Sequence, residues 1–241
     1  RHRDTMNIDL GYDFVTDMLV LEFAIDEKKI DTDTEKNPWL VRASLTFAEA
    51  LRIAASKKLD VEFTELIAGY RVRRNPTGTF VDIYLYDSLS SGAGYASKAA
   101  EEISSLIVET ERILKDCDCD DACYNCLKHY RNQFFHGKLD RFAALELLNW
   151  GKNSVLSVPI DSETQVTYLS RVRNILESFG CMLSFTGDGI FADRDQKRKQ
   201  IIVYPGMWVK PDGNNKVYVS DTYLKYSKPY AVDMIVNKLT E

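Results

Sequence analysis

The sequence predicts an α/β (α+β) fold in which a mixed sheet is flanked by helices and a smaller α/β unit follows. Strand-like and helical runs alternate along the 241 residues, as in sheets covered by helices. Residues 1–150 carry 19 Lys and Arg against 26 Asp and Glu, whereas residues 151–241 carry 12 against 10. This change of charge predicts two domains, 1–150 and 151–241, of which the second has an unknown role.

The first unit begins with an alternating run, Asp13–Ile25, that predicts a strand. Trp39–Lys58 follows as a helix because its apolar residues recur on one face. These residues are Leu40, Ala43, Phe47, Leu51 and Ala54. Two further strands, Val61–Arg74 and Thr79–Tyr86, flank an Asn-Pro-Thr-Gly turn, and we expect a hairpin there.

Gly92–Lys115 has the longest helical pattern in the chain. We expect two more helices, about Cys123–Phe135 and Arg141–Trp150, with Gly137 at a helix end between them. The second unit should open with a helix over Ser162–Phe179 that stops at Gly180. The rest of that unit predicts three strands and a terminal helix: Met182–Phe185, Gly189–Ala192, Gln200–Tyr204 and Pro229–Leu239.

Composition excludes several classes of protein. The chain is 45% hydrophobic and 28% charged, which is typical of a packed globular protein. Its apolar runs are too short to span a membrane, and a net charge of −5 does not draw the whole surface to nucleic acid. The start at Arg1 has neither Met nor signal-peptide pattern, so we expect a fragment of a longer chain. The chain has five cysteines, of which four cluster within ten residues and Cys181 stands alone. This odd, clustered count argues against secreted disulfides and for a cytoplasmic, reducing compartment.

The strongest chemical signal is the spacing Cys117-x-Cys119-x3-Cys123-x2-Cys126. Four soft thiols in one loop can wrap a tetrahedral cation, and a site of four thiolates keeps no open position. We therefore predict a structural, non-catalytic Zn²⁺ site, with Cys126 near the N-terminus of the following helix. Three alternatives stay open: an iron–sulfur cluster, replacement of one thiol by His129, and four unrelated cysteines.

A second candidate site is the turn from Asp87 to Gly94, which follows a strand and opens a helix. Its candidate anion-binding residues are Ser91, Gly92 and Gly94, because backbone N–H groups at a helix N-terminus can hold a phosphate. No Lys follows as it does in a P-loop, so tight packing is the commoner explanation for these glycines. The chain therefore shows no self-contained active site.

Three basic clusters are candidate nucleic-acid contacts. Two of them, around Arg71 and around Lys197, are typical of solvated faces. The third places cations beside aromatic rings next to the cysteines, where they could meet phosphates and stack bases. It consists of Lys128, Arg131, Lys138 and Arg141, with Tyr130, Phe134 and Phe135.

Four blocks in order carry a family resemblance: Leu10–Asp17 (LGYDFVTD), Tyr86–Ala96, Cys117–Leu127 and Tyr130–Arg141. They resemble the zinc-binding C-terminal domain of MrfA-type DEAD/DEAH-box helicases, which is related to domains in the phage-defence proteins of the DISARM and Druantia kinds. The resemblance covers residues 8 to 150 and departs at Ala122-Cys123-Tyr124, where usual members have Gly-Cys-Pro. It implies that all four cysteines bind zinc beside a helicase core.

The sequence thus predicts a zinc-stabilised accessory domain of an ATP-dependent superfamily 2 DNA helicase. Its role would be to guide DNA or dock partners in DNA repair or antiviral defence, with the helicase core in cis or in trans. One alternative is a nuclease or other enzyme that uses the Asp87–Gly94 turn. Another is a protein-docking domain without nucleic-acid contact, which the acidic first unit favours.

Overall fold

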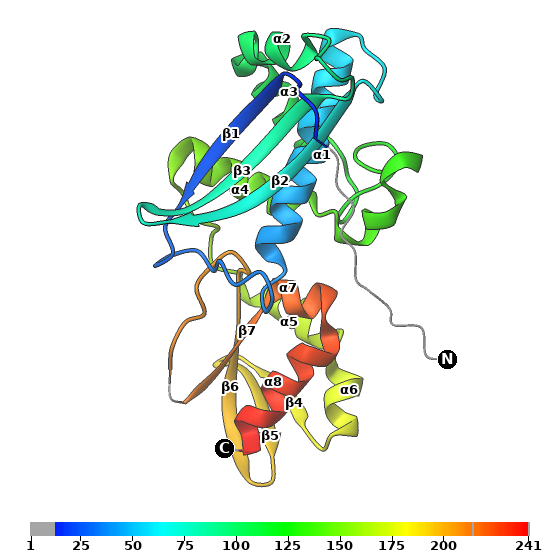
Figure 1. Ribbon diagram of the computed structural model, residues 1–241. Coiled ribbons are helices and arrows are strands. Elements are labelled where there is room, and N and C mark those ends of the chain that lie inside the picture. The colour runs from blue at the N-terminus through cyan, green and yellow to red at the C-terminus, as the bar shows by residue number, and fades with distance from the viewer. Residues whose placement is uncertain (1–12, 214, 241) are drawn as a thin grey trace, which may run out of the picture.

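The structure, a computed structural model, describes residues 13–213 and 215–240, so Leu10–Tyr12 of the first block lie outside the described residues. It shows the predicted mixed α/β fold with two sheets, each packed on helices (Figure 1). Buried apolar residues form two separate clusters, one under each sheet. Among the described helices, none is long and apolar enough to cross a membrane.

The first sheet is antiparallel, in the order β1-β3-β2. Its strands are β1 (Met18–Ile25), β2 (Leu66–Asn75) and β3 (Gly78–Asp87). The β2–β3 hairpin is confirmed, and its turn is held by the Thr77 N–H, which donates to the Asn75 side chain at 3.0 Å. The strand predicted from Asp13 begins only at Met18, because residues 15–17 bond the β3–α2 connection: the Val15 carbonyl accepts from the Ser91 N–H at 2.7 Å.

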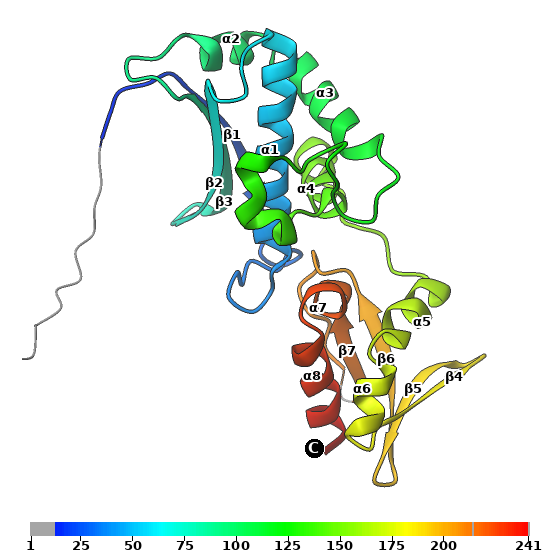
Figure 2. The same ribbon diagram turned by 90° about the vertical axis from the view of Figure 1, so that its right-hand side faces the viewer.

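Helices cover one face of this sheet, and α1 runs between the sheet and the helices α3 and α4 (Figure 2). The elements are α1 (Trp39–Leu59), α2 (Tyr95–Glu101), α3 (Ile103–Lys115), a 3-10 helix η1 (Tyr130–Lys138) and α4 (Arg141–Asn153). The five apolar residues predicted to share a face of α1 are fully buried at 0% exposure. Burial of that face is what stabilises α1 against the sheet.

Two helix predictions near the cysteines are wrong. The Gly92–Lys115 helix is split into α2 and α3 at Glu102, whose φ of −105° is not helical, and α1 is longer than either. Residues Cys123–Phe135 do not form one helix: turns occupy the first part, and Gly137 lies inside η1 rather than at a boundary. The helix predicted at Arg141 is confirmed as α4, and the Asp140 carboxylate caps it by accepting from two backbone N–H groups.

The second unit has a sheet in the order β4-β5-β6-β7, antiparallel except for the parallel β6–β7 pair. The elements are α5 (Ser162–Ser170), α6 (Arg173–Ser178), β4 (Met182–Thr186), β5 (Gly189–Arg194), β6 (Lys197–Tyr204), β7 (Lys216–Ser220), α7 (Asp221–Tyr226) and α8 (Lys228–Thr240). The sequence did not predict β7 or α7. Gly180, at φ +72°, ends α6 as expected.

The single helix predicted over Ser162–Phe179 is two helices. The Arg171 and Val172 N–H groups bond the carbonyls of Tyr168 and Leu169, three residues back, at 3.2 and 3.1 Å. This turn is tighter than a turn of α-helix. It rotates the chain, so that Leu169, Val172 and Leu176 all become fully buried. Burial of these side chains outweighs the continuous helical pattern.

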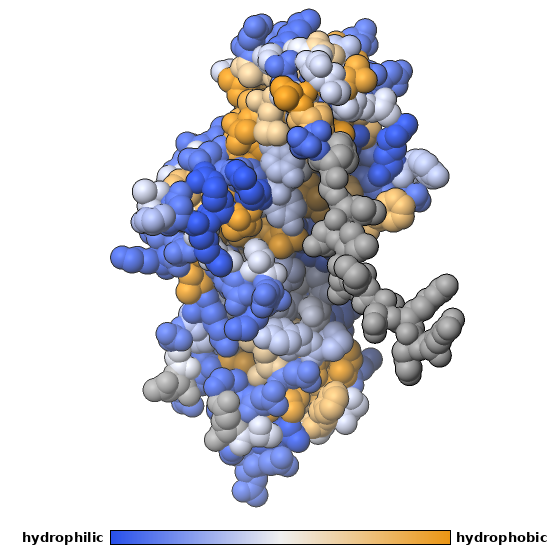
Figure 3. Space-filling model, viewed as in Figure 1, coloured by the Kyte–Doolittle hydropathy of each residue, from blue (hydrophilic) through white to orange (hydrophobic). Residues whose placement is uncertain are grey.

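The face of the first sheet opposite α1 has no helix over it among the described residues (Figure 2). Its upper end carries exposed apolar side chains, Val15, Met18, Val20 and Leu89, and hydrophobic residues gather there in Figure 3. Lower on the same face, Asp82 accepts hydrogen bonds from Arg71 and Arg73. The guanidinium of Arg73 is the main cause that lowers the pKa of Asp82.

The two units contact each other through the chain before α1. Ile30 bridges Trp208 in antiparallel fashion, and the Asn37 side-chain amide donates to the Gly206 carbonyl at 2.6 Å. Met207 is fully buried and belongs to the apolar cluster of the first unit. A segment of the second unit thus completes the core of the first.

Glu146 on α4 is half-buried close to this contact. Its carboxyl accepts hydrogen bonds from the Trp39 indole N–H at 2.5 Å and from the Ser157 hydroxyl at 2.6 Å. Ser157 also touches the Met207 sulfur at 3.2 Å. Burial raises the pKa of Glu146 to about 7, with smaller contributions that include repulsion from Asp221. The charged form is therefore disfavoured in the folded protein.

Glu146→Gln should stabilise the protein at alkaline pH. The pKa of Glu146 is higher in the folded than in the unfolded state. The protonated carboxyl therefore contributes its full stability below the unfolded-state pKa, and this contribution is lost as the pH rises through about 7. The variant, which cannot ionise, should gain on the order of 3 kcal/mol at pH 8 and below about 1 kcal/mol at pH 5. Urea unfolding of both proteins at the two pH values measures this, and an equal difference at both would contradict it.

Candidate metal centre

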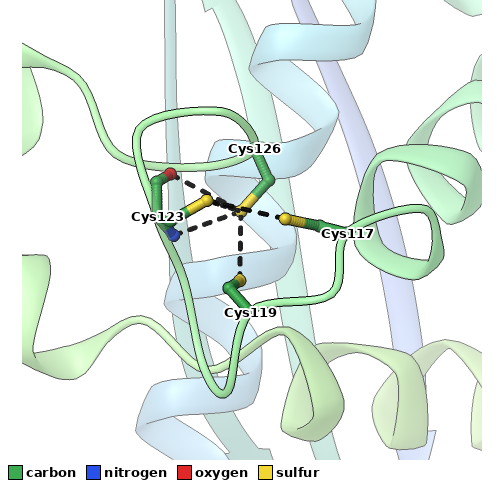
Figure 4. A group of neighbouring side chains, drawn as sticks. All are labelled: Cys117, Cys119, Cys123 and Cys126. Carbon is green, nitrogen blue, oxygen red and sulfur yellow. Dashed lines mark hydrogen bonds between the residues drawn. The ribbon is translucent and has the colours of Figure 1, made fainter.

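The four predicted cysteines converge on one point in the loop between α3 and η1 (Figure 4). Their sulfur atoms all lie within 4.8 Å of one another. The Sγ atoms of Cys117 and Cys123 are 3.5 Å apart, and that of Cys126 lies 3.7 Å from those of Cys119 and Cys123. Four unrelated cysteines would not converge in this way.

These distances fit one tetrahedral ion. A zinc–sulfur bond of about 2.3 Å places the sulfurs of a tetrahedral site about 3.8 Å apart, close to the separations found. A cluster in which several irons each take a thiolate would hold the sulfurs further apart, so the geometry opposes the iron–sulfur alternative. Four thiolates around one ion leave no position for substrate, and the site is therefore structural.

The second half of the loop is a tight turn. The Cys123 carbonyl accepts from the backbone N–H groups of Leu127 and Lys128 at 3.0 and 2.8 Å. The Cys123 N–H points back to the Cys126 sulfur at 3.2 Å. A backbone hydrogen bond from Asn125 is the largest of the causes that lower the pKa of Cys123 to about 7, which favours the thiolate that a metal requires. The α-helix expected directly after Cys126 is absent from this part of the described chain. The backbone hydrogen bonds of the turn stabilise the cysteines in its place.

His129 does not lie among the sulfurs. Its Nε2 is 3.1 Å from a carboxylate oxygen of Glu49 on α1, and its ring packs edge-on against Phe63 at 4.2 Å between centroids. The Asn132 amide donates to the same oxygen of Glu49 at 3.1 Å. The alternative in which His129 replaces a thiol is therefore wrong, since its imidazole is used to attach η1 to α1.

Sequence reasoning missed Glu49 and Asn132, which are 2% and 1% exposed. The available signal was a single acidic residue inside the apolar run Phe47–Leu51. A buried carboxylate needs hydrogen-bond partners, and here the partners come from the segment that follows the cysteines. Glu49 thus joins the long core helix to the metal loop.

Arg141 is also structural rather than a surface contact. It is 7% exposed, and its guanidinium donates to the carbonyls of Cys119 at 2.9 Å and Leu114 at 3.1 Å. These carbonyls belong to the metal loop and to the last turn of α3, where a cation is favourable. The prediction that Arg141 contacts nucleic acid is wrong because the side chain is buried and its Nε and Nη1 groups donate to carbonyls inside the protein.

The candidate anion-binding turn is occupied by the protein itself. The Asp87 carboxylate accepts from the N–H groups of Ala93, Tyr95 and Ala96 at 2.6, 3.1 and 2.8 Å. The N–H groups of Ser91 and Gly92 bond the carbonyls of Val15 and Leu89. The N–H groups of Ser91, Gly92 and Ala93 are therefore used by the protein itself, with the Asp87 carboxylate in the place of an anion, and an enzyme built on this turn lacks support.

Lys128, Arg131 and Lys138, the other predicted cations, lie at the surface, where Lys128 is partly buried and the other two are exposed. Aromatic rings beside them are strongly exposed: Tyr130 at 80% and Phe134 at 88%. Three of the four predicted cations and two of the aromatic rings are thus accessible on the segment that runs from the metal loop through η1.

Comparison with known proteins agrees with this geometry. Residues 47–127 match the family model of the MrfA Zn-binding domain. The Druantia protein DruE of Escherichia coli is 35% identical over 224 residues, which are 88% of this chain but 12% of DruE. The uncharacterized protein MJ1572.1 of Methanocaldococcus jannaschii is 31% identical over 85 residues, 34% of this chain and 76% of that protein.

A crystal structure of the DUF1998 helicase MrfA bound to DNA and AMPPNP aligns with a TM-score of 0.37 and 16% identity, over 54% of this chain and 15% of that one. The family match spans most of α1, the sheet hairpin and all four clustered cysteines. The family match and the convergent thiols together identify the site as one for a structural zinc ion. The chain therefore contains, at residues 47–127, a zinc-binding domain of the MrfA family.

Proposed function

We propose that this chain is a zinc-stabilised accessory domain of an ATP-dependent superfamily 2 DNA helicase or translocase. The observation that carries the proposal is the 35% identity with DruE over 88% of this chain, which includes the zinc-binding segment. The chain spans about 12% of DruE, so ATP hydrolysis would belong to a helicase core that acts with it in cis or in trans. The relation to a Druantia protein favours antiviral defence over DNA repair, and both roles imply the cytoplasm.

Within this function, Cys117, Cys119, Cys123 and Cys126 are the zinc ligands. The ion would hold the end of α3 against the loop before η1, since the loop bonds Arg141 of α4 and η1 bonds Glu49 of α1. Two domains, 1–150 and 151–241, fit the two apolar clusters. The role of the zinc would thus be to fix the position of the surface formed by the metal loop and η1.

That surface would contact DNA through Lys128, Arg131 and Lys138, with Tyr130 and Phe134 available to stack on bases. The same loop carries Asp116, Asp118, Asp120 and Asp121, which reduce its attraction for phosphate. Strong exposure of the rings, together with this acidity, favours a second candidate function, the docking of a protein partner.

A test uses the helicase core that acts with this chain, assembled with the wild-type chain or with Cys123→Ser. We expect strand separation to fall at least tenfold in the variant, while ATP hydrolysis changes much less, because the guide and not the motor is lost. Cys181→Ser is the control, since Cys181 is buried in the second unit. Unchanged strand separation by a zinc-free Cys123→Ser assembly would overturn the proposal.

A further inference from the structure

The second unit contains a lysine-lined groove along its edge strand, β7. The groove has a volume of about 860 Å³ and lies between β7, the loop 210–213 and the last turns of α8. Four lysines and one aspartate supply its charged side chains. They are Lys199, Lys210, Lys216, Lys238 and Asp212.

The charge of this groove differs from that of two other basic clusters in the described chain, whose arginines pair with carboxylates. Arg71 and Arg73 bond Asp82, and Arg198 lies 3.7 Å from Asp193. Lys210 and Lys216 are exposed, and no carboxylate of the described residues lies within salt-bridge distance of either ammonium. Two such lysines that line one groove give it a positive charge, which an anionic ligand would neutralise.

The groove also has an apolar and aromatic part. Val217, Tyr218 and Met234 line it, and the Tyr218 ring is partly exposed. The loop passes so close to this ring that a Cβ added at Gly213 would lie 3.0 Å from it. Lysines that track a backbone, together with a ring on which a base can stack, are typical of grooves that hold single-stranded nucleic acid.

We propose that this groove binds the phosphates of a single-stranded DNA segment through Lys210 and Lys216, with a base against Tyr218. The lysine ammonium acts as a point charge with three donors, and it binds phosphate oxygens in many geometries. Lys199 has a different task, since its ammonium donates to the Lys238 carbonyl at 2.5 Å and caps α8. The inference rests on the proposed association with DNA, and it adds a second contact in the unit whose role the sequence left open.

The experiment measures binding of the 241-residue chain to a fluorescent single strand of about 20 nucleotides over a range of salt. Lys210→Glu/Lys216→Glu should weaken binding at least tenfold and lower the slope of log affinity against log salt by about 1.4, the contribution of two phosphate contacts. The milder pair, Lys210→Gln/Lys216→Gln, should give the same direction with a smaller loss. Zinc content and melting temperature, unchanged in both, show that the fold is intact.

A matched control, Lys28→Glu/Lys98→Glu, changes the net charge equally at exposed lysines of the first unit and should weaken binding less than threefold. A third pair, Arg131→Glu/Lys138→Glu, reports on the surface beside the zinc loop. Equal losses in the groove and control variants, a loss only in the third pair, or no binding by the wild type would overturn the groove. Equal competition by polyglutamate of matched charge would overturn it as well. None of these outcomes changes the helicase-coupling result, so the two proposals fail separately.

Discussion

Cys126→Ser should abolish stoichiometric zinc and lower the free energy of unfolding by about 4 kcal/mol or more, because loss of a structural metal is among the largest single-residue effects. The Cys126 sulfur lies 3.7 Å from two of the other three and also accepts the Cys123 N–H. A serine hydroxyl is a poor zinc ligand and leaves a three-thiol shell. Metal analysis and urea unfolding of the purified variant measure both losses.

Cys181→Ser is the matched control because it makes the same change at a buried cysteine outside the cluster. It should keep one zinc per chain, whatever its own cost in packing. Chelation of zinc from the wild type should reproduce the Cys126→Ser stability and add nothing to the variant. A variant that retains one zinc per chain and the wild-type melting temperature would show that Cys126 is not a ligand.

Local signals in the sequence predicted much of the fold. The hairpin turn at Asn75–Gly78 and the helix from Trp39 depend on residues that are neighbours in the chain, and the structure has both. The cysteine cluster was predictable for the same reason, since all its ligands lie in one loop. Predictions of this kind need no knowledge of what packs on the segment.

Predictions were wrong where a distant partner decides the conformation. Residues 13–17 follow the β3–α2 connection instead of extending β1, because Thr16 donates to the Asp87 carbonyl at 2.9 Å. After Cys126 the chain does not form the predicted α-helix. The N–H groups of Leu127 and Lys128 bond the Cys123 carbonyl, and the His129 side chain bonds Glu49, 80 residues earlier. Periodicity within a window does not contain these contacts.

The candidate site shows the same difference between features set by neighbouring residues and features set by distant contacts. The metal ligands follow from spacing alone, whereas the surface around them depends on burial. Four cations close in sequence formed one predicted cluster, yet Arg141 is directed inward and the others outward. The glycine-rich turn met the pattern of an anion site, but Asp87, at its start, supplies the anion.

Arg141→Met should therefore destabilise the protein and lower its affinity for zinc. Neither effect would come from the loss of a contact with DNA. The carbonyls of Leu114 and Cys119 would each lose a charged hydrogen-bond donor inside the protein. This loss should lower the free energy of unfolding by on the order of 3 kcal/mol. The Cys119 segment would also lose its support, and loss of such a contact behind a metal ligand lowers metal affinity about 10- to 100-fold. Urea unfolding and competition with a zinc chelator measure the two effects.

Arg131→Met provides the comparison, since Arg131 was predicted to play the same part as Arg141 but is exposed. Its stability should change by less than about 0.5 kcal/mol, and its zinc affinity should equal that of the wild type. The methionine replaces the apolar stem of each arginine, so the difference between the variants isolates the guanidinium donors from the packing of the stem. If both variants lost DNA binding equally and neither lost stability, Arg141 would be a surface residue in solution, and its hydrogen bonds to the metal loop would not form.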